Sequence, residues 1–79
     1  MRMPRSVSGK QLVKLLGQVG YQVTRQTGSH IRLTCSEPNQ HHITIPNHDS
    51  IRIGTLSAIV LDVANNLGVP KDDLIGKLF

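Results

Sequence analysis

Hydrophobic and polar positions recur with two different periods along this chain, and the change of period divides it into elements. Four apolar side chains follow the i, i+3, i+4, i+7 spacing that forms one stripe on a helix: Leu12, Leu15, Leu16 and Val19. The Ser8-Gly9-Lys10-Gln11 segment before them fits a capping box, in which the serine hydroxyl and the glutamine side chain each bond a free backbone N–H. The pattern therefore predicts a helix that begins after Ser8 and ends near Val19, where Gly20 stops it.

Three short stretches alternate with a period of two, which is typical of strands with one buried and one solvated face. They cover residues 21–26, 30–35 and 42–45, and a Thr27-Gly28-Ser29 turn joins the first two. Tyr21 and Val23 are expected on the buried face of the first strand. The side chains expected on the solvated face are all polar: Gln22, Thr24, Gln26, His30, Arg32, Thr34, His42 and Thr44.

Two further apolar stripes follow a connecting loop over residues 47–54. The first, Leu56, Ile59, Val60, Val63 and Leu67, marks a second helix. Thr55 is expected to cap this helix and Gly68 to end it, and Pro70 suits the start of a brief third helix. The predicted fold is α+β, with the order α-β-β-β-α and a short extra C-terminal helix, in which two helices cover one face of a three-stranded antiparallel sheet. Residues 1–6 are expected to be disordered and residues 7–79 to form a single domain.

Composition narrows the choice of partner. The 79 residues include nine Lys or Arg and five Asp or Glu, for a net charge of +4, which favours a polyanion such as RNA, DNA or an acidic protein. A single cysteine excludes an internal disulfide and fits a reducing cytoplasm. No apolar stretch has the length of a signal peptide or a membrane span, so we expect a cytoplasmic protein that does not bind a membrane.

His30 is the residue that most suggests catalysis. It follows a tight turn on the polar face of a strand, and histidine can both accept and release a proton near neutral pH. A lone histidine at such a place is more often an ordinary surface residue. A metal site built from His41, His42 and His48 is not favoured, because adjacent strand residues point apart and no carboxylate or cysteine spacing supports it.

Four short blocks, in this order, resemble the HicA family of toxin ribonucleases. They are Ser8-Gly9-Lys10, Arg25-Gln26-Thr27-Gly28-Ser29-His30, Ile43-Thr44-Ile45-Pro46-Asn47-His48 and Gly54-Thr55-Leu56, and the resemblance covers about residues 8–78. It implies a fold similar to that of double-stranded-RNA-binding domains and cleavage of mRNA through the histidine at position 30. It also implies a HicB-type antitoxin that holds the protein inactive.

RNA carries its own nucleophile, the 2′-hydroxyl, so cleavage needs a base, an acid and stabilisation of charge on the phosphate, without a metal or other cofactor. We expect His30 to be the general base. The residues expected to contact RNA are Lys10, Arg25, Gly28, Ser29 and Arg32. The second proton-transfer group is either His42, if its strand pairs beside that of His30, or His48 in the loop beyond.

Two other functions stay open, a non-catalytic double-stranded-RNA-binding module and a small protein-interaction domain. The only aromatic residues are Tyr21, which is expected in the core, and Phe79, so a platform for stacking bases is missing. A passive module would keep its affinity for RNA without His30. An interaction domain would show no salt-dependent affinity for nucleic acid.

Overall fold

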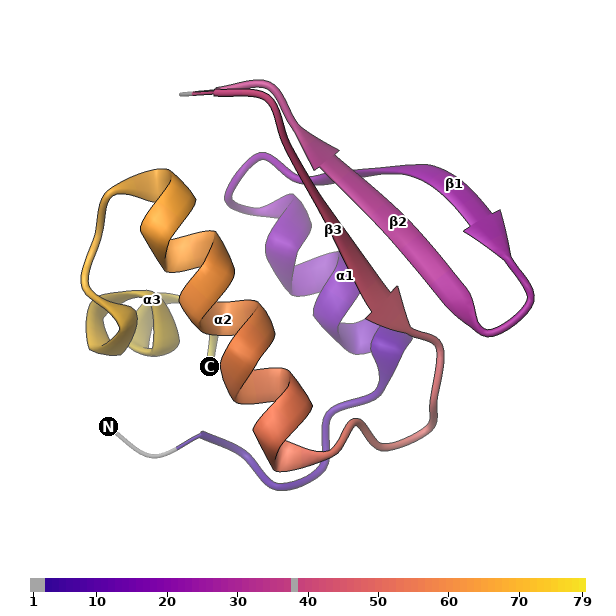
Figure 1. The fold of residues 1–79 in the computed structure, drawn as a ribbon. Helices are drawn as coiled ribbons and strands as arrows, with labels where there is room; N and C mark the ends of the chain where they lie inside the picture. The colour runs from indigo at the N-terminus through magenta and orange to yellow at the C-terminus, as the bar shows by residue number, and fades with distance from the viewer. Residues whose placement is uncertain (1–2, 38) are drawn as a thin grey trace.

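The computed structural model describes residues 3–37 and 39–79, which form a single sheet with helices packed on one of its faces (Figure 1). The elements are α1 (Gly9–Gly17), β1 (Gln22–Thr27), β2 (His30–Cys35), β3 (His41–Pro46), α2 (Ile53–Leu67) and α3 (Lys71–Leu78). The sheet is antiparallel in the order β1-β2-β3. The expected α+β fold is confirmed, including the short third helix.

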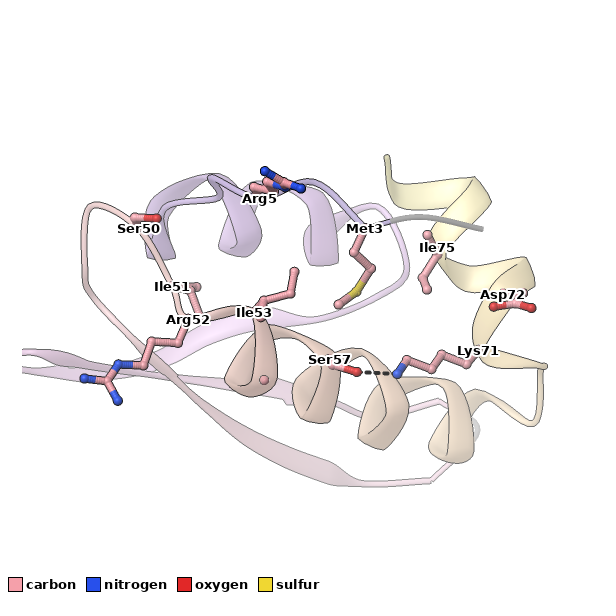
Figure 2. A pocket seen from close by; sticks show the side chains of 11 residues that line it. Met3, Arg5, Ser50, Ile51, Arg52, Ile53, Ser57, Lys71, Asp72 and Ile75 are labelled. Atoms are coloured by element: carbon pink, nitrogen blue, oxygen red, sulfur yellow. Dashed lines mark hydrogen bonds between the residues drawn. The ribbon is translucent and has the colours of Figure 1, made fainter.

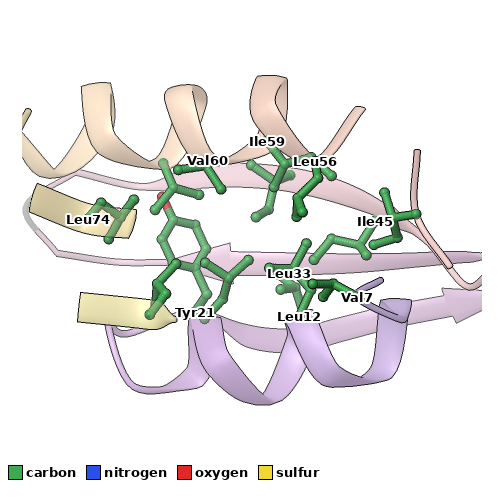
Figure 3. Packing of buried hydrophobic residues seen from close by; sticks show 14 of the residues in the cluster. Val7, Leu12, Tyr21, Leu33, Ile45, Leu56, Ile59, Val60 and Leu74 are labelled. Carbon is green, nitrogen blue, oxygen red and sulfur yellow. The ribbon is translucent and has the colours of Figure 1, made fainter. Parts of the chain in front are cut away.

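The hydrophobic core lies between the inner face of the sheet and the helices (Figure 3). Leu33 and Ile45 on the strands, Leu12 on α1, and Leu56 and Val60 on α2 are each at most 1% exposed. Each such side chain stabilises the fold by about 1.5–3 kcal/mol relative to its exposed state. In the described part of the chain, no helix covers the opposite face of the sheet, which stays open to solvent.

The start of α1 is built as its sequence predicts, but its end differs. Ser8 Oγ accepts the N–H of Gln11 at 3.0 Å, and Gln11 Oε1 accepts the N–H of Ser8 at 2.8 Å, which completes the capping box. The helix ends at Gly17, two residues before Val19, because residues 18–20 form a turn that leads into β1. Gly20 closes this turn with a φ of 100°, a left-handed conformation that favours glycine.

The start of α2 corrects the prediction that Thr55 caps it. The helix already begins at Ile53, and its N-cap residue, Arg52, makes no side-chain capping bond. The neighbouring Ile51 is 2% exposed and donates its N–H to the carbonyl of Val7 at 2.8 Å. This contact between distant segments fixes the chain just before the helix. Gly68 ends α2 in a left-handed conformation, as expected.

Strand β1 departs from the simple alternation predicted for it. Its register shifts between Val23, which pairs with Leu33, and Arg25, which pairs with Arg32, so Thr24 is the extra residue of a β-bulge. From there on, Arg25 and Thr27 share the open face, and Gln26 lies on the other side. Val23 faces the helix side of the sheet, but it lies on an edge strand and is 48% exposed rather than buried.

The N-terminal segment, predicted to be disordered over residues 1–6, is described in part. Residues 1 and 2 lie outside the described residues, and Met3 packs partly buried against the core. In the described part of the chain, no single helix is long and apolar enough to cross a membrane. Together α2 and α3 reach the required length and composition, with a bend of 108° between them.

Candidate functional site

The open face of the sheet brings His30 together with two arginines and two threonines. In the observed register Thr27 lies opposite His30, Arg25 opposite Arg32, and Arg32 opposite Thr44. These five side chains line a shallow depression of about 210 Å³. All three strands contribute to it, so the depression depends on the register of the whole sheet.

The strands supply only positive charge to this face. None of the three strands contains an acidic residue, and the five acids of the chain lie in α2, α3 and the loops. Arg25 and Arg32 are exposed and directly opposed, an arrangement in which like charges repel each other. The depression around His30 therefore presents a positive potential that suits an anionic ligand such as a phosphate.

A tight turn holds His30 at the start of β2. Gly28 and Ser29 form this turn, and Gly28 adopts a φ of 49°, in the left-handed region where a residue with a Cβ is strained. His30 itself is exposed, and no side chain in the described residues hydrogen-bonds its ring. Both ring nitrogens are thus open to a substrate.

The loop after β3 and the start of α1 meet beside this turn. Asn47 donates its N–H to the carbonyl of Ser29 at 2.7 Å, and Gly9 donates its N–H to the carbonyl of His48 at 2.9 Å. A Cβ at Gly9 would lie 2.4 Å from the carbonyl oxygen of Pro46, so only glycine lets the helix come this close. Lys10 follows Gly9 directly. These contacts therefore bring the backbones of His48 and Lys10 close to the Gly28-Ser29 turn.

All of the predicted site residues except His42 therefore fall into three groups. His30, Arg25 and Arg32 line one depression, and Gly28 and Ser29 form the adjoining turn. Lys10 and His48 are exposed beside that turn without lining the depression.

His42 lies apart from these groups. Pro46 is the residue opposite His30, and His42 lies four residues away along β3, opposite Thr34. Four residues of strand span about 13 Å, whereas direct proton transfer needs a contact of about 3 Å. The strand of His42 does pair beside that of His30, as the expectation required, but the register holds His42 too far from His30 for direct proton transfer. His48 is the remaining candidate for the second proton transfer.

Two residues of the depression received no role from the sequence. Alternation alone places Thr44 on the polar face, and the sequence assigns Thr27 to the turn and to one of the family blocks. Thr27 pairs with His30, and Thr44 pairs with Arg32. These two pairings bring the hydroxyl groups of Thr27 and Thr44 beside His30. No local sequence signal gives this placement, because it depends on pairing between strands.

A separate polar network lies at the other end of the sheet. The hydroxyl of Tyr21 lies 2.7 Å from Nδ1 of His41, whose Nε2 lies 3.2 Å from Oδ1 of Asp62. Asn66 donates to the Tyr21 hydroxyl at 3.1 Å. Tyr21 is 1% exposed, and this burial raises the pKa of its hydroxyl above the usual value. The network joins the residue just before β1, and strand β3, to α2, so its role is structural.

A cavity of about 840 Å³ lies between the N-terminal segment, the start of α2 and α3 (Figure 2). Met3, Ile53 and Ile75 give it apolar walls, and Lys71 donates a hydrogen bond to Ser57 across it. None of the residues predicted for the site lines it. In residues 3–37 and 39–79, no three His, Cys, Asp or Glu side chains gather closely enough to hold a metal ion.

A comparison with known protein families matches the part of the chain that forms this face. The model of the family described as "HicA toxin of bacterial toxin-antitoxin" matches residues 9–68, which is more than half of the chain. The chain belongs to the HicA toxin family. The part of this HicA chain that is matched begins with α1 and ends at the C-cap of α2, so it contains the whole open face. Neither a curated protein nor a solved structure matches the chain.

Membership of the HicA family makes this chain the toxin of a bacterial toxin-antitoxin system and implies an antitoxin as its partner. The matched part includes the Gly28-Ser29-His30 turn and the loop that carries His48. Among the helices and strands of residues 3–37 and 39–79, only α3 lies outside the matched part.

Proposed function

We propose that this HicA toxin is a metal-independent endoribonuclease that cleaves mRNA with His30 as the general base. The observation that carries the proposal is the acid-free open face, on which His30 shares one depression with Arg25 and Arg32. A general base must be accessible to its substrate, and the cations must lie where charge develops on the phosphate. The depression supports this assignment, because His30 is exposed there and Arg25 and Arg32 lie beside it.

In this reaction His30 removes the proton from a ribose 2′-hydroxyl. The 2′-oxygen then forms a bond to the adjacent phosphorus, and the bond from phosphorus to the 5′-oxygen of the next nucleotide breaks. Arg25 and Arg32 stabilise the negative charge that builds on the phosphate oxygens. A proton donor then protonates the departing 5′-oxygen. His48 is the remaining candidate for this donor in the chain, and water is the alternative. The products are a 2′,3′-cyclic phosphate and a 5′-hydroxyl.

We further propose a HicB-like antitoxin as the partner that covers the open face. A flat basic surface is blocked most directly by a protein of complementary charge and shape. The same surface would then serve both mRNA and the antitoxin, so the two would exclude each other.

The deciding experiment is cleavage of a long single-stranded RNA in excess chelator. We expect the intact toxin to cleave and His30→Ala to lose about 10²–10⁴-fold in rate, with both proteins shown to be folded. Gln26→Ala is the matched control, because Gln26 is exposed on a neighbouring strand but lies on the other side of the sheet. A substrate with a 2′-deoxy sugar at the cleaved position should be inert.

Two results would contradict the proposal. Equal cleavage by the intact protein and His30→Ala would remove His30 from the reaction. RNA binding by both proteins without cleavage by either would favour a passive RNA-binding module.

A further inference from the structure

A second row of side chains crosses the open face beyond the two arginines. Thr24 Oγ1 lies 2.8 Å from Thr34 Oγ1, which in turn lies 2.8 Å from Nδ1 of His42. Each strand supplies one member, and all three side chains are exposed or half-exposed. The row is therefore a continuous hydrogen-bonded line from one edge of the sheet to the other.

The β-bulge explains how Thr24 joins this row. As the extra residue of β1, Thr24 lies between two regular pairs, Val23 with Leu33 and Arg25 with Arg32. The Thr24 hydroxyl reaches Thr34, while its neighbour Arg25 lines the depression around His30. The consecutive residues Thr24 and Arg25 thus both place their side chains on the open face, which a regular strand does not allow.

The row fixes the orientation of the His42 ring. Since Thr34 engages Nδ1, only Nε2 of His42 is left for a ligand, and His42 is exposed on the open face. When the Thr34 hydroxyl donates to Nδ1, Nε2 carries a hydrogen, and in the protonated ring it carries one as well. A donor that is already oriented loses little conformational entropy when it binds an anion.

The surroundings of the row favour an extended anion. Arg25 and Arg32 lie between it and His30, and the strands contribute no acid. Two acids lie near the row. Asp62 lines a groove with His42 but is engaged by Nε2 of His41 at 3.2 Å, and Glu37 lines a depression with Thr34 at the end of the sheet away from His30. The separation of about 13 Å between the levels of His30 and His42 exceeds the spacing of adjacent phosphates in a nucleic acid strand. A ligand that touches both must therefore be a chain.

We infer that the row formed by Thr24, Thr34 and His42 is a phosphate subsite that holds the backbone of single-stranded RNA on one side of the cleaved bond. The inference rests on the proposed function, because it takes RNA to be the substrate of the open face. In this arrangement His42 binds RNA through Nε2 and transfers no proton. Thr34 is a positioning residue that acts by orienting the ring of His42.

The first test measures binding in the absence of cleavage. Fluorescence anisotropy of labelled RNA oligonucleotides is recorded with His30→Ala as the parent protein, alone and with His42→Ala added. We expect His42→Ala to weaken the binding of a long oligonucleotide about tenfold to a hundredfold, the effect of one hydrogen bond to a charged group. Gln26→Ala, added to the same parent, should change nothing.

Oligonucleotide length gives the site-specific readout. Truncation of the RNA from one end, but not from the other, should abolish the difference between the parent and its His42→Ala variant. Equal weakening at every length and from either end would overturn the inference, because the effect would then be unrelated to a subsite. Thr34→Val keeps the shape of the residue but frees the ring, and we expect it to weaken binding less than His42→Ala does.

Kinetics separate binding from proton transfer. In the toxin with His30 intact, we expect His42→Ala to raise KM for long RNA and to leave kcat unchanged. A loss of kcat like that of His30→Ala, or no change in either KM or affinity, would overturn the inference. If the toxin binds RNA through His42 but cleaves none, the proposed function fails while the subsite stands.

Discussion

Arg25 and Arg32 form a directly opposed pair on neighbouring strands, an arrangement that lowers the stability of the free protein. A phosphate bound between them would turn the repulsion into attraction. We expect Arg25→Thr to raise the free energy of unfolding by about 0.2–1 kcal/mol and to weaken RNA binding. Urea denaturation measures the first effect, and anisotropy titrations over a range of salt concentrations measure the second.

The salt dependence makes this prediction specific. Loss of one phosphate contact should reduce the slope of log affinity against log salt concentration by about 0.7 for a single strand. Lys77→Gln, on α3 and away from the sheet, should leave the slope unchanged. An unaltered slope for Arg25→Thr would mean that RNA does not use this pair.

Tyr21 gives a prediction that depends on pH. Because burial raises the pKa of its hydroxyl, the unfolded chain releases this proton near pH 10, and the folded chain releases it only at higher pH. The contribution of the protonated Tyr21 hydroxyl to the free energy of unfolding is therefore complete below about pH 10. It is lost as the pH rises through the pKa of the folded state. Tyr21 is the only tyrosine in the chain, so an ultraviolet absorbance titration of the folded and urea-unfolded protein reads it directly.

Tyr21→Phe is the control for that titration. It should be less stable at neutral pH by about 1–3 kcal/mol, because His41 and Asn66 lose their partner. Its free energy of unfolding should also fall less steeply above pH 10 than that of the intact protein. Identical titration of Tyr21 in the folded and unfolded states would show that the hydroxyl is not buried in solution.

At the scale of elements, the close approach of α1 to the loop after β3 depends on Gly9. We expect Gly9→Ala to destabilise the fold by about 1–3 kcal/mol, because its Cβ would clash with the backbone at Pro46. Gly17→Ala is a matched control on the same helix, with nothing within 4 Å of the added Cβ. It should stabilise the fold by up to about 1 kcal/mol through helix propensity. Equal effects of the two substitutions in urea denaturation would contradict the packing argument.

The helices and most of the sheet could be predicted because their patterns are local. The apolar stripe that contains Leu12 and Leu16, like the alternation through Ile31 and Leu33, depends only on spacing within one segment. The start of α2 could not be predicted in this way, because Ile51 is held by the distant Val7. Stripes in the sequence report which face of an element is buried, but not which distant segment fixes its ends.

Local patterns also predict part of the candidate site, but not the features that depend on strand pairing. The side of β2 that carries His30 and Arg32 follows from local alternation. Alternation predicts Gln26 on the open face, whereas the structure has Arg25 there. This difference results from a bulge that exists only in the pairing of β1 with β2, so a single segment does not predict it. The distance between His30 and His42 likewise depends on the β2–β3 register, which no single segment encodes.

At the scale of the whole molecule, shape and charge decide how the toxin can be inhibited. The chain measures 31 × 28 × 17 Å, and its candidate chemistry lies on a broad open face rather than in a deep cleft. A small inhibitor would have little to fill, whereas a protein can cover the face. All five acids lie off the sheet, so an antitoxin that presents carboxylates to the sheet would meet no like charge there.

We therefore expect the antitoxin to shield His30 and to compete with RNA for the same surface. Chemical modification of histidines and lysines, mapped on peptides, should show His30 and Lys10 protected in the complex, while Lys77 on α3 reacts as in the free toxin. The affinity of the complex should fall as salt rises, because its attraction is partly electrostatic. An antitoxin that abolishes cleavage while His30 stays fully reactive would have to act by distorting the sheet. The register that joins Arg25, Arg32 and Thr44 would then be the point of control, since a change in strand pairing would disperse the depression without covering it.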